Sequence, residues 1–150
     1  MTKLDIKIKK LDKNAKMPTY GTPFSAGADL YACAPEPVVL EPGKTVLVHT
    51  GLAFEICEGY GGFVFARSGL ATKKGLAPAN KVGVIDSDYR GELMIPLHNS
   101  SSETAVIENG ERVAQIVFLP YAAATFIETD ALDETVRGTG GFGSTGAGLA

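Results

Sequence analysis

Short apolar segments alternating with turn-forming clusters constrain the fold of this chain more than any other feature of its 150 residues. The segments are rich in β-branched and aromatic side chains, and they read TVLVHTGLAFEI (45–56), GGFVFA (61–66), ELMIPLH (92–98) and RVAQIVFLPY (112–121). Around them lie EPGK, CEGYGG and ENGE, whose composition is typical of turns. No long stretch has helical periodicity. The pattern predicts an all-β domain in which antiparallel strands form a sandwich or barrel.

One short helix is expected within ARSGLATKKG, residues 66–75. The Ser68 hydroxyl is expected to cap its start, and Gly75 is expected to end it. Because a helix start presents free N–H groups and the positive end of a dipole, Arg67 and Ser68 at this point suit a phosphate. A simple cap beside a surface arginine is an equally good interpretation of the same residues.

Composition limits the size and the partners of the molecule. A hydrophobic content of 45% predicts one compact domain, and a net charge of -3 gives no electrostatic reason to bind a long polyanion such as duplex DNA. Cys33 and Cys57 are the only cysteines, and nothing resembles a signal peptide or an 18-residue apolar span. We therefore expect a soluble intracellular protein with reduced thiols, with no stable nucleic acid partner and no membrane partner.

The stretch NKVGVIDSDYRGEL, residues 80–93, is the most informative one. Two apolar segments flank the polar turn DSDYRG, which predicts a hairpin. Asp86 and Asp88 are ordinary turn formers in one interpretation. A turn does not require the aromatic Tyr89, however, and a ring beside a carboxylate can pack on a ligand while the carboxylate acts on water. Gly83 and Gly91 would let a ligand approach the backbone closely.

Two polar residues within apolar surroundings raise the question of their partners. Asp29 lies among small residues in SAGADLYA (25–32), where a turn aspartate that satisfies local backbone donors is the favoured interpretation. Gln115 is the one uncharged polar residue in ERVAQIVF (111–118), and a buried amide needs partners from neighbouring backbone or from a ligand. Neighbouring backbone is the favoured interpretation for Gln115.

A glycine-rich stretch, RGTGGFGSTG, lies close to the C-terminus at residues 137–146. We expect residues 1–136 to form a β-rich body and residues 137–150 to form a mobile arm. The glycines do not follow the spacing of a P-loop, and no dinucleotide-binding strand precedes them.

The other residues of this arm carry chemistry of their own. Arg137, Ser144 and Thr145 supply a charge and two hydroxyls, and Phe142 supplies a flat ring. This set suits a phosphorylated compound that carries a flat base. A disordered linker is the alternative, and it explains neither the arginine nor the phenylalanine.

In order and in wording, these stretches resemble the five motifs of the trimeric dUTPases, the dUTP pyrophosphatases. The resemblance runs from PTYGTPFSAGADLYA through ARSGLA, NKVGVIDSDYRGEL and ERVAQIVF to RGTGGFGSTG, which is nearly the whole chain. It implies an all-β, jelly-roll-like (β-clip) subunit, and a homotrimer whose active sites are each built from all three chains. It also implies hydrolysis of dUTP to dUMP and pyrophosphate, which keeps uracil out of DNA and supplies dUMP for dTMP synthesis. The arm would close a neighbouring active site over bound nucleotide.

The resemblance also implies roles for individual residues. Asp86 would orient and deprotonate a water that attacks the α-phosphorus in line, while Tyr89 would pack against the deoxyribose where a ribose 2′-hydroxyl would have to lie. The backbone around Gly83 and the side chain of Asn80 would match the donors and acceptors of uracil. Phe142 would stack on the uracil ring. The remaining substrate-binding residues would be Arg67, Ser68, Gly69, Gln115, Arg137, Gly143, Ser144 and Thr145.

Mg²⁺ is the cofactor that the resemblance implies. The triphosphate itself would chelate the ion, and Asp29 and Gln115 would act on it through water. The spacing of histidine, cysteine and carboxylate residues suggests no dedicated metal site, and we expect His49 and His98 to be structural.

Three alternatives to a dUTPase stay open at this point. They are a dCTP deaminase-like enzyme on the same fold, a catalytically silent regulatory protein, and a generic nucleotide-binding module. The expected location is the cytoplasm, with the nucleus or an organelle left open for a eukaryotic source.

Overall fold

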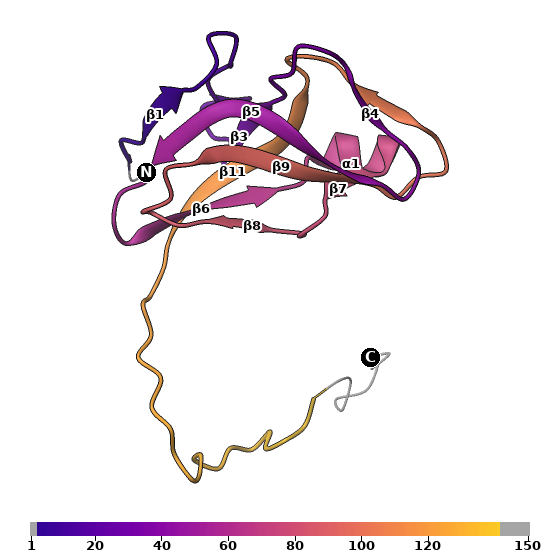
Figure 1. The fold of residues 1–150 in the computed structure, drawn as a ribbon. Coiled ribbons are helices and arrows are strands. Elements are labelled where there is room, and N and C mark those ends of the chain that lie inside the picture. Colours follow the sequence, from indigo (N-terminus) through magenta and orange to yellow (C-terminus); the bar gives the residue numbers. More distant parts are fainter. Residues whose placement is uncertain (1–2, 142–150) are drawn as a thin grey trace.

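Two antiparallel sheets and a small two-stranded ribbon form the body of the chain in the computed structural model, which describes residues 3–141 (Figure 1). The first sheet contains, in spatial order, β1 (Lys7–Lys10), β5 (Thr45–Glu55), β9 (Glu92–Asn99) and β7 (Leu76–Pro78). The second contains β2 (Thr19–Tyr20), β3 (Ala28–Tyr31), β11 (Arg112–Pro120), β6 (Tyr60–Phe65) and β8 (Gly83–Ile85). The ribbon pairs β10 (Ala105–Ile107) with β4 (Val38–Leu40). The predicted all-β architecture is confirmed, and the arrangement is jelly-roll-like.

The hydrophobic core lies between the sheets. In β9 the side chains alternate between buried and partly exposed along the strand, as expected for a strand with one face on a core. Ile95 and Leu97 of this strand belong to the same buried cluster as Leu30 of β3 and Ile116 of β11, and all four are fully buried. Burial of aliphatic side chains from both sheets therefore holds the layers together.

A bulge in β5 joins the first sheet to the segment that precedes β2. The pairing of β5 with β9 shifts register between His49 and Ala53, and Gly51 has a left-handed φ of 67°. A side chain at Gly51 would collide with Cys33 Sγ, at 3.1 Å from the added Cβ, and with atoms of the segment before β2. Glycine is required at this position because the conformation and the close packing both exclude a larger residue.

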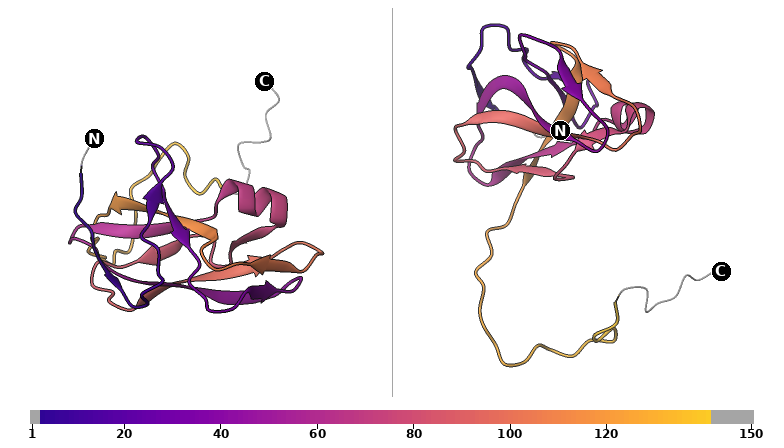
Figure 2. Two further views of the ribbon diagram at one scale, coloured as in Figure 1. Left: turned by 90° about the horizontal axis from the view of Figure 1, so that it is seen from above. Right: turned by 45° about the vertical axis from the view of Figure 1, so that its right-hand side comes forward.

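The predicted helix is α1 (Ser68–Lys74), which lies at one end of the body and packs beside β7 (Figures 1 and 2). Gly75 ends it in the left-handed conformation with φ 66°, as expected. The expectation that Ser68 caps the start was wrong. Arg67 occupies the N-cap position with extended backbone angles, no side chain caps the helix, and Ser68 is its first helical residue.

The chain leaves the body at the end of β11. From residue 121 to residue 139 every residue is exposed, and the segment runs away from the sheets in Figure 1 and in the right-hand view of Figure 2. The strands thus end ahead of the boundary that we predict after residue 136, which stays a prediction about the assembled protein. No helix in the described part of the chain is long and apolar enough to span a membrane.

Candidate active site

Three neighbouring strands bring Asp29, Gln115 and the end of β6 together. Asp29 in β3 lies opposite Gln115 in β11, and Gln115 lies opposite Phe65 in β6. Arg67 lies two residues after the end of β6, and its Nε donates a hydrogen bond of 2.7 Å to Asp29 Oδ1. The register of the second sheet therefore gathers residues from three separate sequence motifs at one level of the sheet.

Asp29 binds two arginines rather than the local backbone donors that we favoured for it. Arg112 Nη1 donates to the second carboxylate oxygen at 3.3 Å, while the Arg67 bond occupies the first. The Asp29 side chain is only 14% exposed, whereas that of Arg112 is 52% exposed. The mostly buried carboxylate thus holds both guanidinium groups in place.

Gln115 has the backbone partner that we favoured. Its Nε2 donates to the Ala66 carbonyl at 2.9 Å. Gly27 lies against the other end of the amide, because a Cβ added there would lie 3.1 Å from Gln115 Cδ and closer still to Oε1. Gly27 therefore leaves the space that the Gln115 side chain occupies.

A basic hollow adjoins this group of residues. It has a volume of about 420 Å³, and its lining includes Arg67, Gly69, Lys73, Lys74 and Arg112. Lys74 is engaged by Glu111 at 3.3 Å. Ser68 and Gly69 are exposed, and open space surrounds Gly69, so that a ligand can approach the backbone there. A hollow with several cations suits a polyanionic group such as a chain of phosphates.

The segment from Asn80 to Gly83 makes a tight turn into β8. Lys81 has a left-handed φ of 66°, and the Val82 N–H donates to the Asn80 carbonyl at 2.7 Å. The Asn80 amide lies close above Gly83, since a Cβ added to Gly83 would be 3.3 Å from Asn80 Nδ2. The Asn80 amide thus packs against Gly83, which is itself buried against Val64 of β6.

The predicted hairpin over residues 80–93 was only partly correct. The polar turn exists, and the Tyr89 N–H donates to the Asp86 carbonyl at 3.2 Å. However, β8 pairs with β6 in the second sheet, while β9 pairs with β5 and β7 in the first. The turn therefore connects two sheets instead of two paired strands.

Asp86 and Tyr89, the two predicted site residues of this turn, are both exposed. Within residues 3–141 the Asp86 carboxylate has no hydrogen-bond or ion-pair partner, so it is open to water. The Tyr89 side chain folds back, and its hydroxyl donates to the Glu92 carbonyl at 3.0 Å. The carboxylate that the sequence singled out is thus exposed and the ring is anchored, and their joint role stays a prediction.

A single chain does not bring Asp86 to the group around Asp29. Ile85 of β8 lies opposite Gly62 of β6. Asp29 and Gln115 lie at the level of Phe65, on the two strands beyond β6 in the same sheet. Three residues along a strand at ~3.3 Å each and three strand spacings of ~4.8 Å place Ile85 roughly 17 Å from Asp29, and Asp86 lies one residue further away. The predicted site residues thus form two half-sites, one around Asp29 and one in the turn of residues 80–91.

The arm is described only in part. Arg137 Nε donates to the Gly140 carbonyl at 2.8 Å, and this part of the chain touches neither half-site. Phe142, Gly143, Ser144 and Thr145 lie outside the described residues. Their predicted roles stay predictions.

Neither histidine lies in a half-site. His49 Nδ1 is 2.9 Å from Glu92 Oε2, and His98 Nδ1 is 3.0 Å from the Thr45 hydroxyl. Among residues 3–141 no group of three or more histidine, cysteine or acidic side chains could hold a metal ion. A metal at either half-site would need most of its ligands from water or from substrate.

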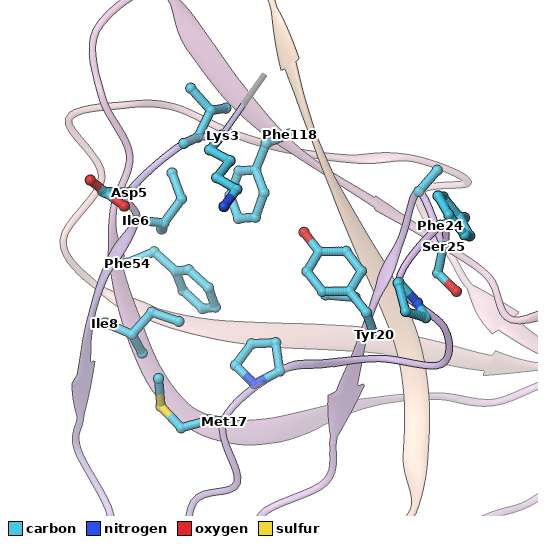
Figure 3. Close-up of a pocket in the computed structure, with 15 residues that line it drawn as sticks. Lys3, Asp5, Ile6, Ile8, Met17, Tyr20, Phe24, Ser25, Phe54 and Phe118 are labelled. Carbon is cyan, nitrogen blue, oxygen red and sulfur yellow. The ribbon is translucent and has the colours of Figure 1, made fainter. Parts of the chain in front are cut away.

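A larger hollow lies elsewhere on the body. It has a volume of about 700 Å³, and Figure 3 shows Ile6, Ile8, Tyr20, Phe54 and Phe118 around it. None of the predicted site residues that the structure describes lines this hollow. Its walls are largely apolar. We therefore choose the two half-sites as the candidate active site because of their charged and polar side chains, although this hollow is larger.

Reasoning from sequence missed two contributors to the site. Arg112 shares Asp29 with Arg67, and the signal available for it was its place three residues before Gln115 in the same motif. Gly27 was not singled out, although its place two residues before Asp29 was a usable signal.

Comparison with known proteins agrees with these features. A family model described as dUTPase matches residues 13–146. The deoxyuridine 5'-triphosphate nucleotidohydrolase of Desulfitobacterium hafniense is 54% identical over 145 residues, which are 96% of each chain. The dUTPase of Staphylococcus bacteriophage 80alpha, solved with dUPNHPP, is 31% identical with a TM-score of 0.86, over 95% of this chain and 98% of that one. A mutant dUTPase from phage phi11 of S. aureus, described as coordinating a structural Mg(II) ion, is 27% identical with a TM-score of 0.77, over 85% of this chain and 98% of that one.

Proposed function

Since this chain belongs to the dUTPase family, we propose that it hydrolyses dUTP to dUMP and pyrophosphate at sites shared between subunits. Its family and its relatives make it a dUTP diphosphatase. The observation that carries the mechanism is the exposed Asp86 carboxylate, which has no hydrogen-bond or ion-pair partner among residues 3–141, in the same turn as the anchored Tyr89 ring.

The turn of residues 80–91 recognises the nucleoside. Uracil presents an N–H donor between two carbonyl acceptors, and the Asn80 amide with the backbone next to Gly83 supplies the complementary set. Cytosine would leave buried donors or acceptors unpaired, which discriminates by roughly four powers of ten in sites of this kind. The 5-methyl group of thymine would collide with so close a backbone, and the Tyr89 ring packs against the deoxyribose.

Asp86 activates the nucleophile. Its carboxylate accepts a proton from a water molecule while the water oxygen attacks the α-phosphorus. The bond from the α-phosphorus to the oxygen that bridges to the β-phosphorus breaks, and pyrophosphate leaves with that oxygen. A carboxylate is a weak base for water, so positioning and charge neutralisation supply most of the acceleration.

The basic half-site holds the phosphates. Arg67 and Ser68, with Gly69, lie at the edge of the basic hollow, and Asp29 fixes the Arg67 guanidinium. Carboxylate and amide oxygens are acceptable to Mg²⁺, so Asp29 and Gln115 suit an ion that the triphosphate chelates and that reaches them through water. When bound, Mg²⁺ neutralises charge on the phosphates.

Sharing between subunits follows from the separation of the half-sites. Asp86 and Arg67 must both lie within a few ångström of one triphosphate. In one chain, however, Ile85 beside Asp86 pairs with Gly62, and Arg67 lies five residues further along, roughly 17 Å away at ~3.3 Å per residue. A second copy of the chain supplies the missing half, and a homotrimer with three equivalent sites satisfies all copies. The arm of residues 137–150 closes the site, with Phe142 on the uracil ring and Arg137, Gly143, Ser144 and Thr145 on the phosphates.

The location and the excluded partners are also part of the proposal. We place the enzyme in the cytoplasm, in keeping with its free Cys33 and Cys57, and we assign it no stable nucleic acid or membrane partner. A dCTP deaminase is disfavoured because the family match is to dUTPases.

Pyrophosphate release with Mg²⁺ from dUTP, dCTP, dTTP and UTP tests the proposal. Release from dUTP far above the other three is expected. Comparable release from dTTP or UTP would contradict the roles of Gly83 and Tyr89, and ammonia from dCTP would indicate a deaminase. Analytical ultracentrifugation of the same sample gives the subunit number, for which a monomer would contradict the shared site.

A further inference from the structure

We propose that Gly91 fixes the position of the Tyr89 ring and so sets the preference for deoxyribose over ribose. The inference rests on the proposed packing of Tyr89 against the sugar, and it makes Gly91 a positioning residue that need not touch the substrate. It concerns an exposed glycine whose presence a simple turn does not require.

The Tyr89 ring lies directly over the backbone at residue 91. A Cβ added to Gly91 would lie 2.6 Å from Tyr89 Cζ and 2.9 Å from Cε2, and closer still to the hydroxyl oxygen. Real Cβ atoms essentially never approach other atoms so closely. Any side chain at residue 91 must therefore push the ring away from its present position.

Backbone conformation does not explain the glycine. Gly91 is not among the glycines with a left-handed φ, whereas Gly51 and Gly75 are. An alanine at residue 91 meets no conformational penalty of that kind. The contact with the Tyr89 ring is thus the reason that the structure offers for a glycine at this position.

The partner of the Tyr89 hydroxyl is itself held firmly. The hydroxyl donates to the Glu92 carbonyl, and the Glu92 carboxylate accepts the Gly51 N–H at 2.8 Å while its other oxygen lies 2.9 Å from His49 Nδ1. Gly51 belongs to the bulge of β5 in the first sheet. The ring is therefore held to a fixed point of the first sheet, while its turn begins in the second.

A fixed ring can exclude a hydroxyl group where a mobile one cannot. The ribose 2′-hydroxyl must collide with the ring to be rejected, and a displaced ring leaves room for it. Gly91→Ala should consequently favour UTP relative to dUTP. Loss of the ring contact with the sugar should also lower turnover of dUTP itself.

A double-mutant cycle isolates this contact. We would measure kcat/KM for dUTP and UTP in the wild type, Gly91→Ala, Tyr89→Ala and the double variant, all as full-length protein with Mg²⁺. Gly91→Ala is expected to lower the dUTP-to-UTP ratio roughly tenfold, which is within the range of coupling between contacting residues. In the Tyr89→Ala background the same change should alter the ratio less than about twofold, because no ring remains to displace.

Several outcomes overturn the inference, and they differ from failure of the proposed function. A wild-type ratio in Gly91→Ala, or an equal fall in both backgrounds, would show that Gly91 does not act through the ring. A wild-type ratio in Tyr89→Ala would instead contradict the role of Tyr89 at the sugar, and absence of dUTP turnover in the wild type would contradict the enzyme.

Two controls separate this effect from damage to the fold. Gly21→Ala alters another exposed glycine whose nearest added contact is an ordinary 3.6 Å to Ser25 Oγ, and its ratio should match the wild type. Thermal unfolding followed by circular dichroism should give the same midpoint for Gly91→Ala and the wild type. If Gly91→Ala is unstable, the double variant should recover stability, because removal of the ring removes the collision.

Discussion

Asp29 lies in β3 and Asp86 directly follows β8, a strand of the same sheet, yet the two carboxylates have opposite surroundings in the folded chain. Asp29 is mostly buried, and two arginines bind its two oxygens. Asp86 is exposed, and among the described residues its carboxylate has no partner. The comparison shows that the charged contacts of the half-site around Asp29 are already formed in one chain, whereas the Asp86 carboxylate is open to water.

Asp86→Asn is expected to have the largest effect on activity. The amide cannot accept the proton of the attacking water, so kcat for dUTP should fall by roughly 10²–10⁴, the range for loss of a general base. Because the Asp86 side chain is exposed and has no partner within residues 3–141, the unfolding temperature should not change. Pyrophosphate release measures the first quantity, and calorimetric titration with dUTP should detect binding. Near-normal turnover would contradict the role of Asp86.

Removal of residues 137–150 should have the next largest effect. The arm is proposed to close the site over the nucleotide, so its loss removes Arg137 and the other proposed donors to the phosphates. A fall in kcat/KM of roughly 10²–10³ is expected, as for loss of oriented donors to a developing charge. Circular dichroism and ultracentrifugation should show a folded trimer, whereas an unfolded product would mean that the arm belongs to the core.

Asp29→Asn, unlike Asp86→Asn, should lower the stability of the fold as well as the activity. Loss of the charge leaves Arg67 and Arg112 without their carboxylate, which should lower the free energy of unfolding by about 1–3 kcal/mol. Turnover should fall by roughly 10-fold to 10²-fold because the phosphate-binding arginine is less well oriented.

Asp88→Asn is the matched control for both aspartates, because Asp88 is an exposed member of the open turn. It should leave both turnover and unfolding near the wild-type values. If urea titration gives the wild-type unfolding midpoint for Asp29→Asn, the Asp29 carboxylate does not stabilise the fold, and the proposed difference between the two half-sites is wrong.

The smallest effect is expected at an ion pair of the first sheet. The Lys7 ammonium lies 2.7 Å from Glu55 Oε1, and this hydrogen bond, with the charge of Lys7, holds the pKa of Glu55 below its ordinary value. Because the folded pKa lies below the unfolded one, the contribution of the pair is present above the unfolded pKa and is lost as pH falls through the folded pKa.

Lys7→Ala tests this pair. The pKa of Glu55 should rise toward its ordinary value, as followed by NMR titration of the carboxyl carbon, and dUTP turnover should not change. A change in turnover as large as that of Asp29→Asn would mean that the site depends on charges outside the two half-sites.

The strands were predictable because the pattern of apolar residues within each segment indicates which of its faces is buried. Alternation in ELMIPLH and the apolar run RVAQIVFLPY indicate strands without knowledge of their partners, and both exist as β9 and β11. The pairing of β8 was not predictable from the turn that follows it. Gly62 of β6 lets Ile85 of β8 pack closely, with 3.4 Å from an added Cβ to Ile85 Cβ, and this contact joins positions far apart in the chain.

The candidate site shows the same difference between local patterns and contacts that are distant in sequence. Residue types indicated the chemistry of Asp86 and Tyr89, because an aromatic residue and a carboxylate share one local turn. The partners of Asp29 were missed because they depend on strand register, with Arg67 38 positions away and Arg112 83 positions away. Local sequence thus indicates which groups are available, and the sheet decides which of them meet.

If Arg137 binds as proposed, the exposed segment that follows β11 is the tether that carries it to a site. Fully extended at ~3.3 Å per residue, residues 121–137 span roughly 55 Å, which exceeds the width of a body of this size. Tethers of such lengths give local concentrations of millimolar order. Closure of a site would then depend on linker length rather than on protein concentration. Lengthening the segment would weaken closure gradually, whereas shortening it below the span between sites would abolish closure.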